Sequence, residues 1–541
     1  MFNAGKIKKE TWCLMGILTL ALILRLVMPV AVQTPDSALY LELADRMKMG
    51  HLDIERFGEA VKFLQPGYSA VIALGSFIIG DVRNTGIFIS ILCGVASVLV
   101  CYQLGKKMFG HQIGALFSIM IAISPLFISY SAKILTESIF TLLFLVIVYL
   151  TWEYYRAERS WWYLLFGVSI GALYLIRMVG LLCLAVPIGL SVIDFYRRSM
   201  SWRRLCATLT LLFVGFAIVA GPYIYFISRQ YGHLVFTGMQ DYYESVSTVM
   251  TDMKYDMFDS DVQETVQANK KAALYRLNNN RTDYEFYGHS TGDANYSSSS
   301  ITTVIGKRLQ NFISNIPYNI KFFTFIFATE TLAILIIISA MVRGRVPWKQ
   351  YVFLLAWIAV VMLVPLSGRS VYRYYFPVVP LLWLVTITSV MYVFRRINIR
   401  LVRNYFIGMA LVFVILYGFI INVLVIHDYI LNFGKVFYRY GPEAVGTEFR
   451  KAFGDGQKIL STNRVFVYYA GGLSYPVPYA PISDVVVFAR NNGIGYLAIN
   501  HKINDYAGVG LDSLTALYPE HLLELWQAKE GIIVYKIIGT R

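Results

Sequence analysis

An acidic residue, Asp36, stands a few positions after the end of the first long apolar run, near Val30. An ionisable side chain at the edge of a membrane span is costly to keep there, which makes it a candidate for function. A carboxylate in this position could accept a proton from a nucleophile or orient it. The alternative is structural, because Pro35-Asp36-Ser37 is also a good helix start and Asp36 could merely cap that helix at the membrane surface.

Cationic residues stand at further boundaries of apolar runs. They are Lys133, Arg177, Arg369 and Arg373. The guanidinium fork of Arg suits a phosphate group, so we expect these residues to form a basic, anion-binding site at the outer membrane boundary. Alternatively, such side chains reach to lipid headgroups, a reading that fits Lys133 as well as function does. Arg177 lies in an apolar stretch, where a charge without a function is harder to explain.

Long apolar blocks must position these residues. The chain has 541 residues, of which 57% are hydrophobic and 15% charged, and its mean hydropathy is +0.55. A membrane-spanning helix needs about 20 apolar residues. Eleven candidate spans follow: 11–31, 85–104, 111–129, 134–151, 161–176, 180–196, 205–228, 319–342, 350–366, 374–394 and 404–427. The residues from 161 to 196 are either two short spans that meet at Arg177 or one broken hairpin. The first run lacks a small-x-small cleavage site, so we expect a retained anchor.

The net charge is +15, and the distribution of the basic residues along the chain indicates the membrane topology. Basic clusters occupy every second short loop, which the positive-inside rule assigns to the cytoplasm. The clusters are Lys6/Lys8/Lys9, Lys106/Lys107, Arg156/Arg159, Arg197/Arg198/Arg203/Arg204, Arg343/Arg345/Lys349 and Arg395/Arg396/Arg400/Arg403. This places the N-terminus inside and the C-terminus outside, and it makes a nucleic-acid partner unnecessary to explain the charge.

Four regions then face the exterior: 32–84, 129–137, 229–318 and 428–541. In the first, helical spacing from Ser37 to Met49 and a short apolar run from Ala70 to Ile79 predict two helices at the membrane surface. The second is a short connection before the run at 134–151. The third is polar and too long for an ordinary turn, which is typical of a lid, a binding loop or a disordered stretch.

The tail has the pattern of a small α/β domain. Strands are predicted at 458–462 and 494–499, a helix at 483–492, and a hairpin from 522–526 and 531–538. We therefore expect a polytopic α-helical membrane domain over 1–428, with exterior loops 32–84 and 229–318, and an extracytoplasmic α/β domain over 429–541.

Several chemistries have no motif here. The chain contains no GxxxxGK[ST], no GxGxxG after a strand and no HExxH, and its seven His residues never form a ligand-like pair. Its five Cys residues all lie within or beside apolar runs, so they indicate neither a disulfide framework nor a metal site. An exterior enzyme cannot draw on cytosolic nucleotide sugars, so any group that it transfers must arrive on a membrane lipid.

Five short motifs follow one another along the chain, and their order is informative. They are Asp36-Ser37 with Tyr40, Gln65-Pro66-Gly67-Tyr68, Thr136-Glu137-Ser138, the stretch from Gly171 to Arg177, and Arg373-Tyr374-Tyr375-Phe376-Pro377. With their order and topology, the chain resembles the GT-C superfamily of polyprenyl-phosphate-sugar-dependent glycosyltransferases, specifically the protein O-mannosyltransferase and lipid A aminoarabinose transferase branch. The resemblance covers nearly all of the chain. Gln65 replaces the His or Lys of many relatives, and the Glu-Lys pair of the aminoarabinose branch is shifted to Glu59 and Lys62, which puts that branch's sugar specificity in doubt.

The resemblance implies an inverting transfer of a sugar from a polyprenyl-phosphate donor to a lipid, glycan or protein acceptor at the extracytoplasmic face of the cell (inner) membrane. Asp36 would be the catalytic base or position the acceptor. The donor phosphate would contact Arg177, Arg373, Lys133 and Arg369, and the substrates would be positioned by Tyr40, Gln65, Glu137 and Tyr374. A divalent cation, magnesium or manganese, assists some relatives, and the sequence names no metal ligand for one.

Two other functions remain as alternatives. A lipid or solute transporter or flippase would explain many spans and intramembrane charges, but explains poorly why the platform, the long loop and the terminal domain share one side. A sensor or scaffold that binds wall polymers is a third interpretation.

Overall fold

The computed structural model describes residues 4–28, 34–50, 65–154, 160–232, 234–237, 275–277, 284–286, 328–342, 346, 348–367, 372–394, 442–461, 463–478, 482–500, 522–527 and 532–539. The chain forms two compact units. The first, called here the membrane unit, consists of residues 1–31, 65–237 and 302–425. The second, called here the tail unit, consists of residues 32–64, 238–301 and 426–541, so part of the predicted first exterior loop groups with the tail.

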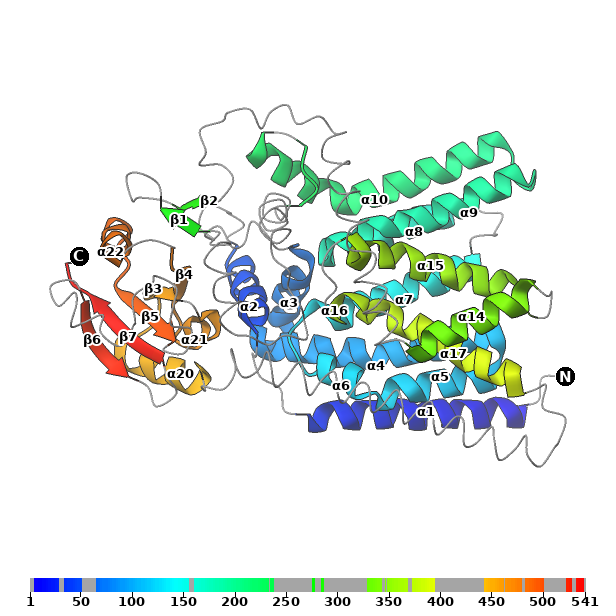
Figure 1. Ribbon diagram of the computed structural model, residues 1–541, viewed down its shortest axis with the longest axis horizontal. Helices are drawn as coiled ribbons and strands as arrows, with labels where there is room; N and C mark the ends of the chain where they lie inside the picture. Colours follow the sequence, from blue (N-terminus) through cyan, green and yellow to red (C-terminus); the bar gives the residue numbers. More distant parts are fainter. Residues whose placement is uncertain are drawn as a thin grey trace. The chain divides into compact units, whose positions relative to one another are not determined.

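The membrane unit is a set of helices that pack side by side (Figure 1). Its first helices are α1 (Ala4–Val27), α3 (Gly67–Ile79), α4 (Val82–Phe109), α5 (His111–Ile123), α6 (Pro125–Ser131), α7 (Thr136–Tyr154) and α8 (Trp161–Ile176). They are followed by η3 (Met178–Leu184), α9 (Ala185–Tyr196), α10 (Trp202–Tyr231), α14 (Ala328–Val342), α15 (Trp348–Ser367), α16 (Tyr372–Tyr375), η5 (Phe376–Val378) and α17 (Val379–Phe394).

Within the described residues, five helices are long and apolar enough to cross a membrane, and the bent pair α5–α6 makes a sixth. Five more apolar helices are shorter: Gly67–Ile79, Trp161–Ile176, Glu330–Met341, Trp348–Leu363 and Phe376–Tyr392. The predicted fold class, a polytopic α-helical membrane protein, is therefore confirmed. The predicted span at 404–427 lies outside the described residues, and the number of spans stays a prediction.

The predicted span 111–129 is broken rather than continuous. Its two halves meet at an angle of 59°. Pro125 opens α6 and lacks the N–H that would otherwise bond the carbonyl oxygen of Ile121, so the helix cannot continue unchanged. The buried Arg25 of α1 donates from Nη2 to Ile121 O at 3.5 Å and from Nη1 to Ala122 O at 3.3 Å. Its Nε also donates to Ser131 Oγ at 3.2 Å, so one side chain bonds both halves of the break.

Glycines let α8 and α10 cross with their backbones in contact. A Cβ at Gly167 would collide with the backbone of α10, and one at Gly215 would collide with the backbone of α8. The helix α8 ends at Ile176, and its C-cap residue Arg177 has an extended backbone, with a φ of −151° and a ψ of 134°. The apolar stretch from Met178 to Tyr196 then forms a separate candidate span. The predicted break at Arg177 is therefore confirmed.

The tail unit contains a five-stranded mixed sheet with the order β4-β3-β5-β7-β6 (Figure 1). Its strands are β3 (Lys458–Ser461), β4 (Leu473–Tyr475), β5 (Tyr496–Asn500), β6 (Leu522–Gln527) and β7 (Ile532–Ile537). Four pairings define its topology: β3 pairs in parallel with β4 and with β5, β7 is antiparallel to β5, and β6 is antiparallel to β7.

Helices cover both faces of this sheet because its strand residues alternate between two cores. Ile459, Ala498 and Val534 face α20 (Pro442–Phe453) and α21 (Arg464–Tyr469). Leu460, Leu497 and Tyr535 belong to the core formed with α22 (Ile482–Asn491). The predicted strands, hairpin and helix of the tail are confirmed, whereas α20, α21 and β4 were not predicted.

Two further elements belong to the tail unit. The helix α2 (Pro35–Lys48) has Thr34 as its N-cap, with the Thr34 side chain accepting from the backbone N–H of Ser37. It contacts α21. The short strands β1 (Tyr275–Leu277) and β2 (Tyr284–Phe286) form an antiparallel pair inside the predicted long loop.

Candidate functional site

Arg177 and Glu137 form an ion pair inside the membrane unit. Arg177 ends α8 and Glu137 lies in the first turn of α7, and their Nη1 and Oε1 atoms are 3.4 Å apart. The Glu137 side chain is 0% exposed and that of Arg177 is 14% exposed. A carboxylate so deeply buried depends on its cationic partner, because removal of one member leaves an uncompensated charge.

Aromatic rings from two elements surround the same guanidinium. Its Cζ lies 5.9 Å from the ring centroid of Phe140 on α7 and 5.9 Å from that of Tyr374 on α16. The planar guanidinium is held by charge and by cation–π contact together. The structure therefore brings three predicted site residues, Arg177, Glu137 and Tyr374, to one place.

Gln65 starts the chain segment that packs against the end of α8. It is 7% exposed, and neither its amide oxygen nor its amide nitrogen has a hydrogen-bond partner within the described residues. A Cβ on Gly67 would lie 2.6 Å from the carbonyl oxygen of Leu175, so this turn touches α8 two residues before Arg177. A buried amide without a partner costs about 1–3 kcal/mol, so Gln65 offers a donor and an acceptor that a ligand could bond.

Unpartnered hydroxyls accompany Glu137 at the start of α7. The side-chain oxygens of Thr136, Ser138 and Thr141 are buried and make no hydrogen bond within the parts of the chain that the structure describes. Most buried polar groups in proteins are bonded. With Gln65, these hydroxyls make the Arg177 region rich in polar atoms that a ligand with hydroxyl or phosphate oxygens could satisfy.

The other predicted cations are placed less fully. Lys133 lies in the turn between α6 and α7, with its Nζ 5.4 Å from the ring centroid of Tyr130. The Tyr130 ring contacts Phe376, which directly follows α16, at 4.6 Å. The backbone of Arg373 belongs to α16, next to Tyr374, whereas its side chain and the whole of Arg369 lie outside the described residues.

Asp36 and Tyr40 belong to the tail unit. Asp36 lies in the first turn of α2 and is partly exposed, and Tyr40 is 6% exposed. That Asp36 acts together with the cations of the membrane unit stays a prediction.

The contacts of α2 tie it to the tail. Glu42 and Arg46 form an ion pair with 2.7 Å between oxygen and nitrogen. Burial raises the pKa of Glu42, and the charges of Arg46 and of Arg464 on α21 act against that shift. The helix that carries Asp36 is therefore anchored to the sheet domain.

Sequence reasoning missed two buried charges of the membrane unit. Arg25 is 0% exposed, and Glu330 is 7% exposed and accepts a bond from Trp383 Nε1 at 3.1 Å. Both lie inside candidate apolar spans, and an ionisable residue within such a run was the signal that could have found them.

Metal ligands do not gather in the parts of the chain that the structure describes. Over these ranges, no group of three or more His, Cys, Asp or Glu side chains could hold an ion. The divalent cation that the resemblance leaves open stays a prediction, and no chemical step below is routed through it.

One comparison with known families matches part of the chain. A family model described as dolichyl-phosphate-mannose-protein mannosyltransferase matches residues 65–225, which run from Gln65 through α3 into α10. A comparison with curated protein sequences gives no match.

Solved structures share the fold over nearly the whole chain. ArnT from Cupriavidus metallidurans bound to undecaprenyl phosphate is 14% identical, with a TM-score of 0.52 and coverage of 99% of both chains. The oligosaccharyltransferase of Archaeoglobus fulgidus in complex with zinc and sulfate is 12% identical, with a TM-score of 0.56, covering 97% of this chain and 72% of the other. The archaeal oligosaccharyltransferase AglB from the same organism, in complex with an inhibitory peptide and a dolichol-phosphate, is 11% identical, with a TM-score of 0.54, covering 98% and 74%.

The apolar helices and these shared folds define a multi-pass membrane protein. The chain has the GT-C fold, and its resemblance to polyprenyl-phosphate-sugar-dependent glycosyltransferases, predicted from its motifs, is confirmed.

Proposed function

We propose that the chain is an integral membrane glycosyltransferase that moves a sugar from a polyprenyl-phosphate donor to an envelope acceptor, with inversion at the anomeric carbon. The acceptor is a lipid, a polysaccharide or a protein, and the sugar is a hexose or a pentose. The family match and the relatives bound to undecaprenyl phosphate and dolichol-phosphate support this donor class over the transporter or flippase. The proposed location is the inner membrane, with the active site extracytoplasmic.

The observation that carries the proposal is the Arg177 region. Its guanidinium is held by Glu137 and two rings, and the unpartnered amide of Gln65 belongs to a turn packed against the same helix end. A fixed cation in a largely buried setting stabilises negative charge that develops during a reaction. The departing polyprenyl phosphate gains such charge, and the amide and nearby hydroxyls can bond its oxygens or those of the sugar.

The proposed reaction is a single displacement. The acceptor hydroxyl oxygen bonds to the anomeric carbon from the face opposite the phosphate, and the bond between that carbon and the phosphate oxygen breaks with its electron pair on the phosphate. The acceptor proton passes to the carboxylate of Asp36. Arg177 and Arg373 bond the departing phosphate and stabilise its negative charge. Lys133 and Arg369 are further cations that stabilise it.

The test is a transfer assay with a synthetic polyprenyl-phosphate sugar and membranes or purified chain. The variant Gln65→Met replaces a buried, unpartnered amide with an apolar side chain of similar size. We expect it to unfold at an equal or higher temperature, since the amide costs about 1–3 kcal/mol, while transfer falls strongly. The matched control is Gln103→Met, because Gln103 is exposed on α4 and should change neither property.

Full transfer by Gln65→Met would remove Gln65 from the site. Absence of any transfer by the wild-type chain, together with movement of the intact lipid across the bilayer, would favour the transporter or flippase instead.

A further inference from the structure

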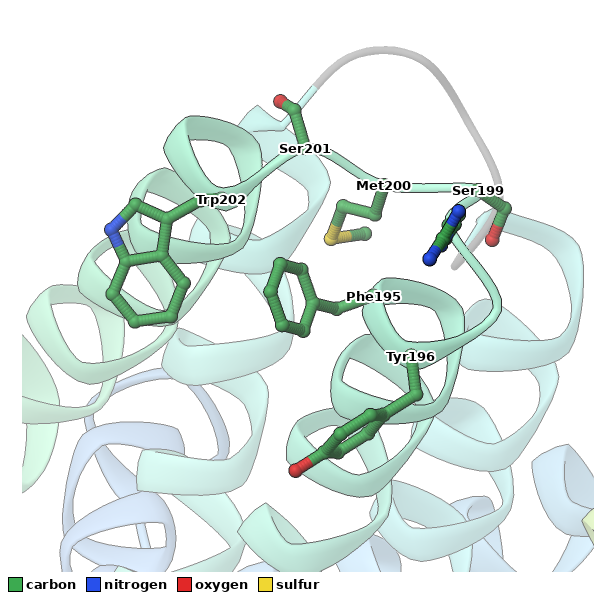
Figure 2. Close-up of a pocket in the computed structure, with 7 residues that line it drawn as sticks. Phe195, Tyr196, Ser199, Met200, Ser201 and Trp202 are labelled. Carbon is green, nitrogen blue, oxygen red and sulfur yellow. The ribbon is translucent and has the colours of Figure 1, made fainter.

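The turn between α9 and α10 borders an open hollow at the ends of two candidate membrane spans. The spans Met178–Tyr196 and Trp202–Arg229 stop on either side of it. A cavity of about 570 Å³ lies there, and Figure 2 shows its lining side chains from the end of α9, the turn and the start of α10. They include Phe195, Tyr196, Arg198, Met200 and Trp202. None of these residues belongs to the Arg177 region.

Positive charge concentrates around this hollow. The segment from Asp194 to Arg204 contains four arginines and one acid. They are Arg197, Arg198, Arg203 and Arg204. Arg197 has its guanidinium 5.4 Å from the ring centroid of Trp348, while Arg198 and Arg203 are exposed. Within the described ranges, no ion pair involves Arg197, Arg198 or Arg203.

Another predicted cytoplasmic loop shows the contrasting arrangement. Lys106 Nζ lies 2.9 Å from Glu10 Oε2, and Lys107 Nζ lies 2.8 Å from Glu153 Oε1. Protein carboxylates therefore neutralise the basic pair at the end of α4. No such carboxylate pairs with Arg197, Arg198 or Arg203 within the described residues. These arginines can therefore bind an anionic group from outside the described part of the chain.

Aromatic residues flank the same turn at its surface. Tyr196 is 79% exposed and Trp202 is 64% exposed, at the last residue of α9 and the first of α10. Rings in this position are typical of the level of the lipid headgroups. The side chains of Phe195 and Met200 add an apolar wall, with the Phe195 ring 5.7 Å from that of Trp202.

The backbone of the turn is held in one shape. Arg198 has a φ of 56° and is the only residue other than glycine with a positive φ in the described parts of the chain. Its N–H donates to Phe195 O at 2.9 Å, and the Ser199 N–H and Oγ both donate to Asp194 O, at 3.0 and 2.7 Å. A left-handed conformation is uncommon for a side chain of this size, so the turn presents Arg198 beside the cavity at a conformational cost.

We propose that the α9–α10 turn binds the headgroup of an anionic phospholipid in the membrane leaflet that borders it. Arg198, with Arg197 and Arg203, bonds the phosphate, and Phe195, Met200 and Trp202 contact the glycerol and upper acyl region. The occupant is a bilayer lipid because the hollow joins Arg198, which forms no ion pair within the described residues, to an apolar wall between two span ends. The site is separate from the proposed donor site, and by the basic-loop topology it faces the cytoplasm.

Quenching of tryptophan fluorescence tests this proposal on the full chain in nanodiscs. The quenchers are phosphatidylglycerol and phosphatidylcholine with brominated acyl chains, mixed into unlabelled phosphatidylcholine. Subtraction of the spectrum of Trp202→Phe isolates the signal of Trp202. We expect phosphatidylglycerol to quench Trp202 at a much lower mole fraction than phosphatidylcholine does.

In the double variant Arg198→Gln/Arg203→Gln, the preference for phosphatidylglycerol over phosphatidylcholine should fall by about fivefold for each arginine removed. The control Lys107→Gln, a neutralised cation, should keep it. Equal quenching by the two lipids in the wild-type chain would overturn the proposal, and this comparison needs no variant. A preference that survives in the double variant would also overturn the proposal. So would a preference that millimolar inorganic phosphate abolishes, because that result is expected of a site for a free anion.

Discussion

Removal of the Glu137 charge, with its shape kept, should strengthen the binding of a phosphate at Arg177. The two charges are 3.4 Å apart, which corresponds to an attraction of about 5 kcal/mol at an effective dielectric constant near 20. In the wild-type chain a phosphate must compete with this carboxylate for the guanidinium. In Glu137→Gln that competition is gone, so we expect the Kd for a polyprenyl phosphate to fall by about tenfold or more, since tenfold corresponds to only about 1.4 kcal/mol.

Arg177→Gln should have the opposite effect on binding. It removes the cation that pairs with the fully buried Glu137 carboxylate, and breaking a buried ion pair costs about 3–5 kcal/mol of stability. The double variant Glu137→Gln/Arg177→Gln should recover most of that stability, because neither member of the pair is still charged, but it should still bind the phosphate weakly.

The assay measures the Kd for a polyprenyl phosphate and the thermal unfolding midpoint of each purified variant in the same detergent. Glu330→Gln is the matched control, because Glu330 is also a buried carboxylate of the membrane unit but bonds Trp383. It should leave phosphate affinity unchanged. The reasoning is refuted if Glu137→Gln weakens phosphate binding as much as Arg177→Gln does, since both residues would then serve only the fold.

Four further outcomes are expected. Asp36→Asn should lower transfer by about 10²–10⁴-fold with near-normal expression, because a positioned base contributes that much, and activity within a few-fold of wild type would exclude this role. Arg373→Ala should weaken donor use strongly and Arg373→Lys should restore only part of it, whereas full activity of the Lys variant in steady-state kinetics would indicate a contact with bulk headgroups. Reporter fusions at Gly456 and Arg345 should report opposite sides of the membrane, and two cytoplasmic signals would contradict the topology. Arg25→Met should lower the unfolding midpoint, because it strips the donors from the carbonyl oxygens at the α5–α6 break, and an unchanged midpoint would show that the break holds without them.

The order and type of the elements could be predicted from the sequence. Long apolar runs identify membrane helices, because a segment in lipid must form all its backbone hydrogen bonds within itself and a helix does so. Both the run and the helix are local properties of the chain. The alternation in β7, where Ile533 and Tyr535 face one core and Val534 the other, is equally local. Arg177 stands out in the same local way, as an ionisable group in an apolar stretch, whereas Glu137 and Tyr374 follow from the motifs that carry the family resemblance.

Only the tertiary structure decided which of these groups meet. The sequence does not reveal that Arg177 pairs with Glu137, because that pairing depends on how the end of α8 packs on the start of α7. Nor does it reveal that Gln65 has no hydrogen-bond partner within the described residues, since burial of a side chain is set by distant segments. The helix of Asp36 illustrates the same limit: its spacing predicts a surface helix, but only the long-range packing against α21 places it in the tail unit.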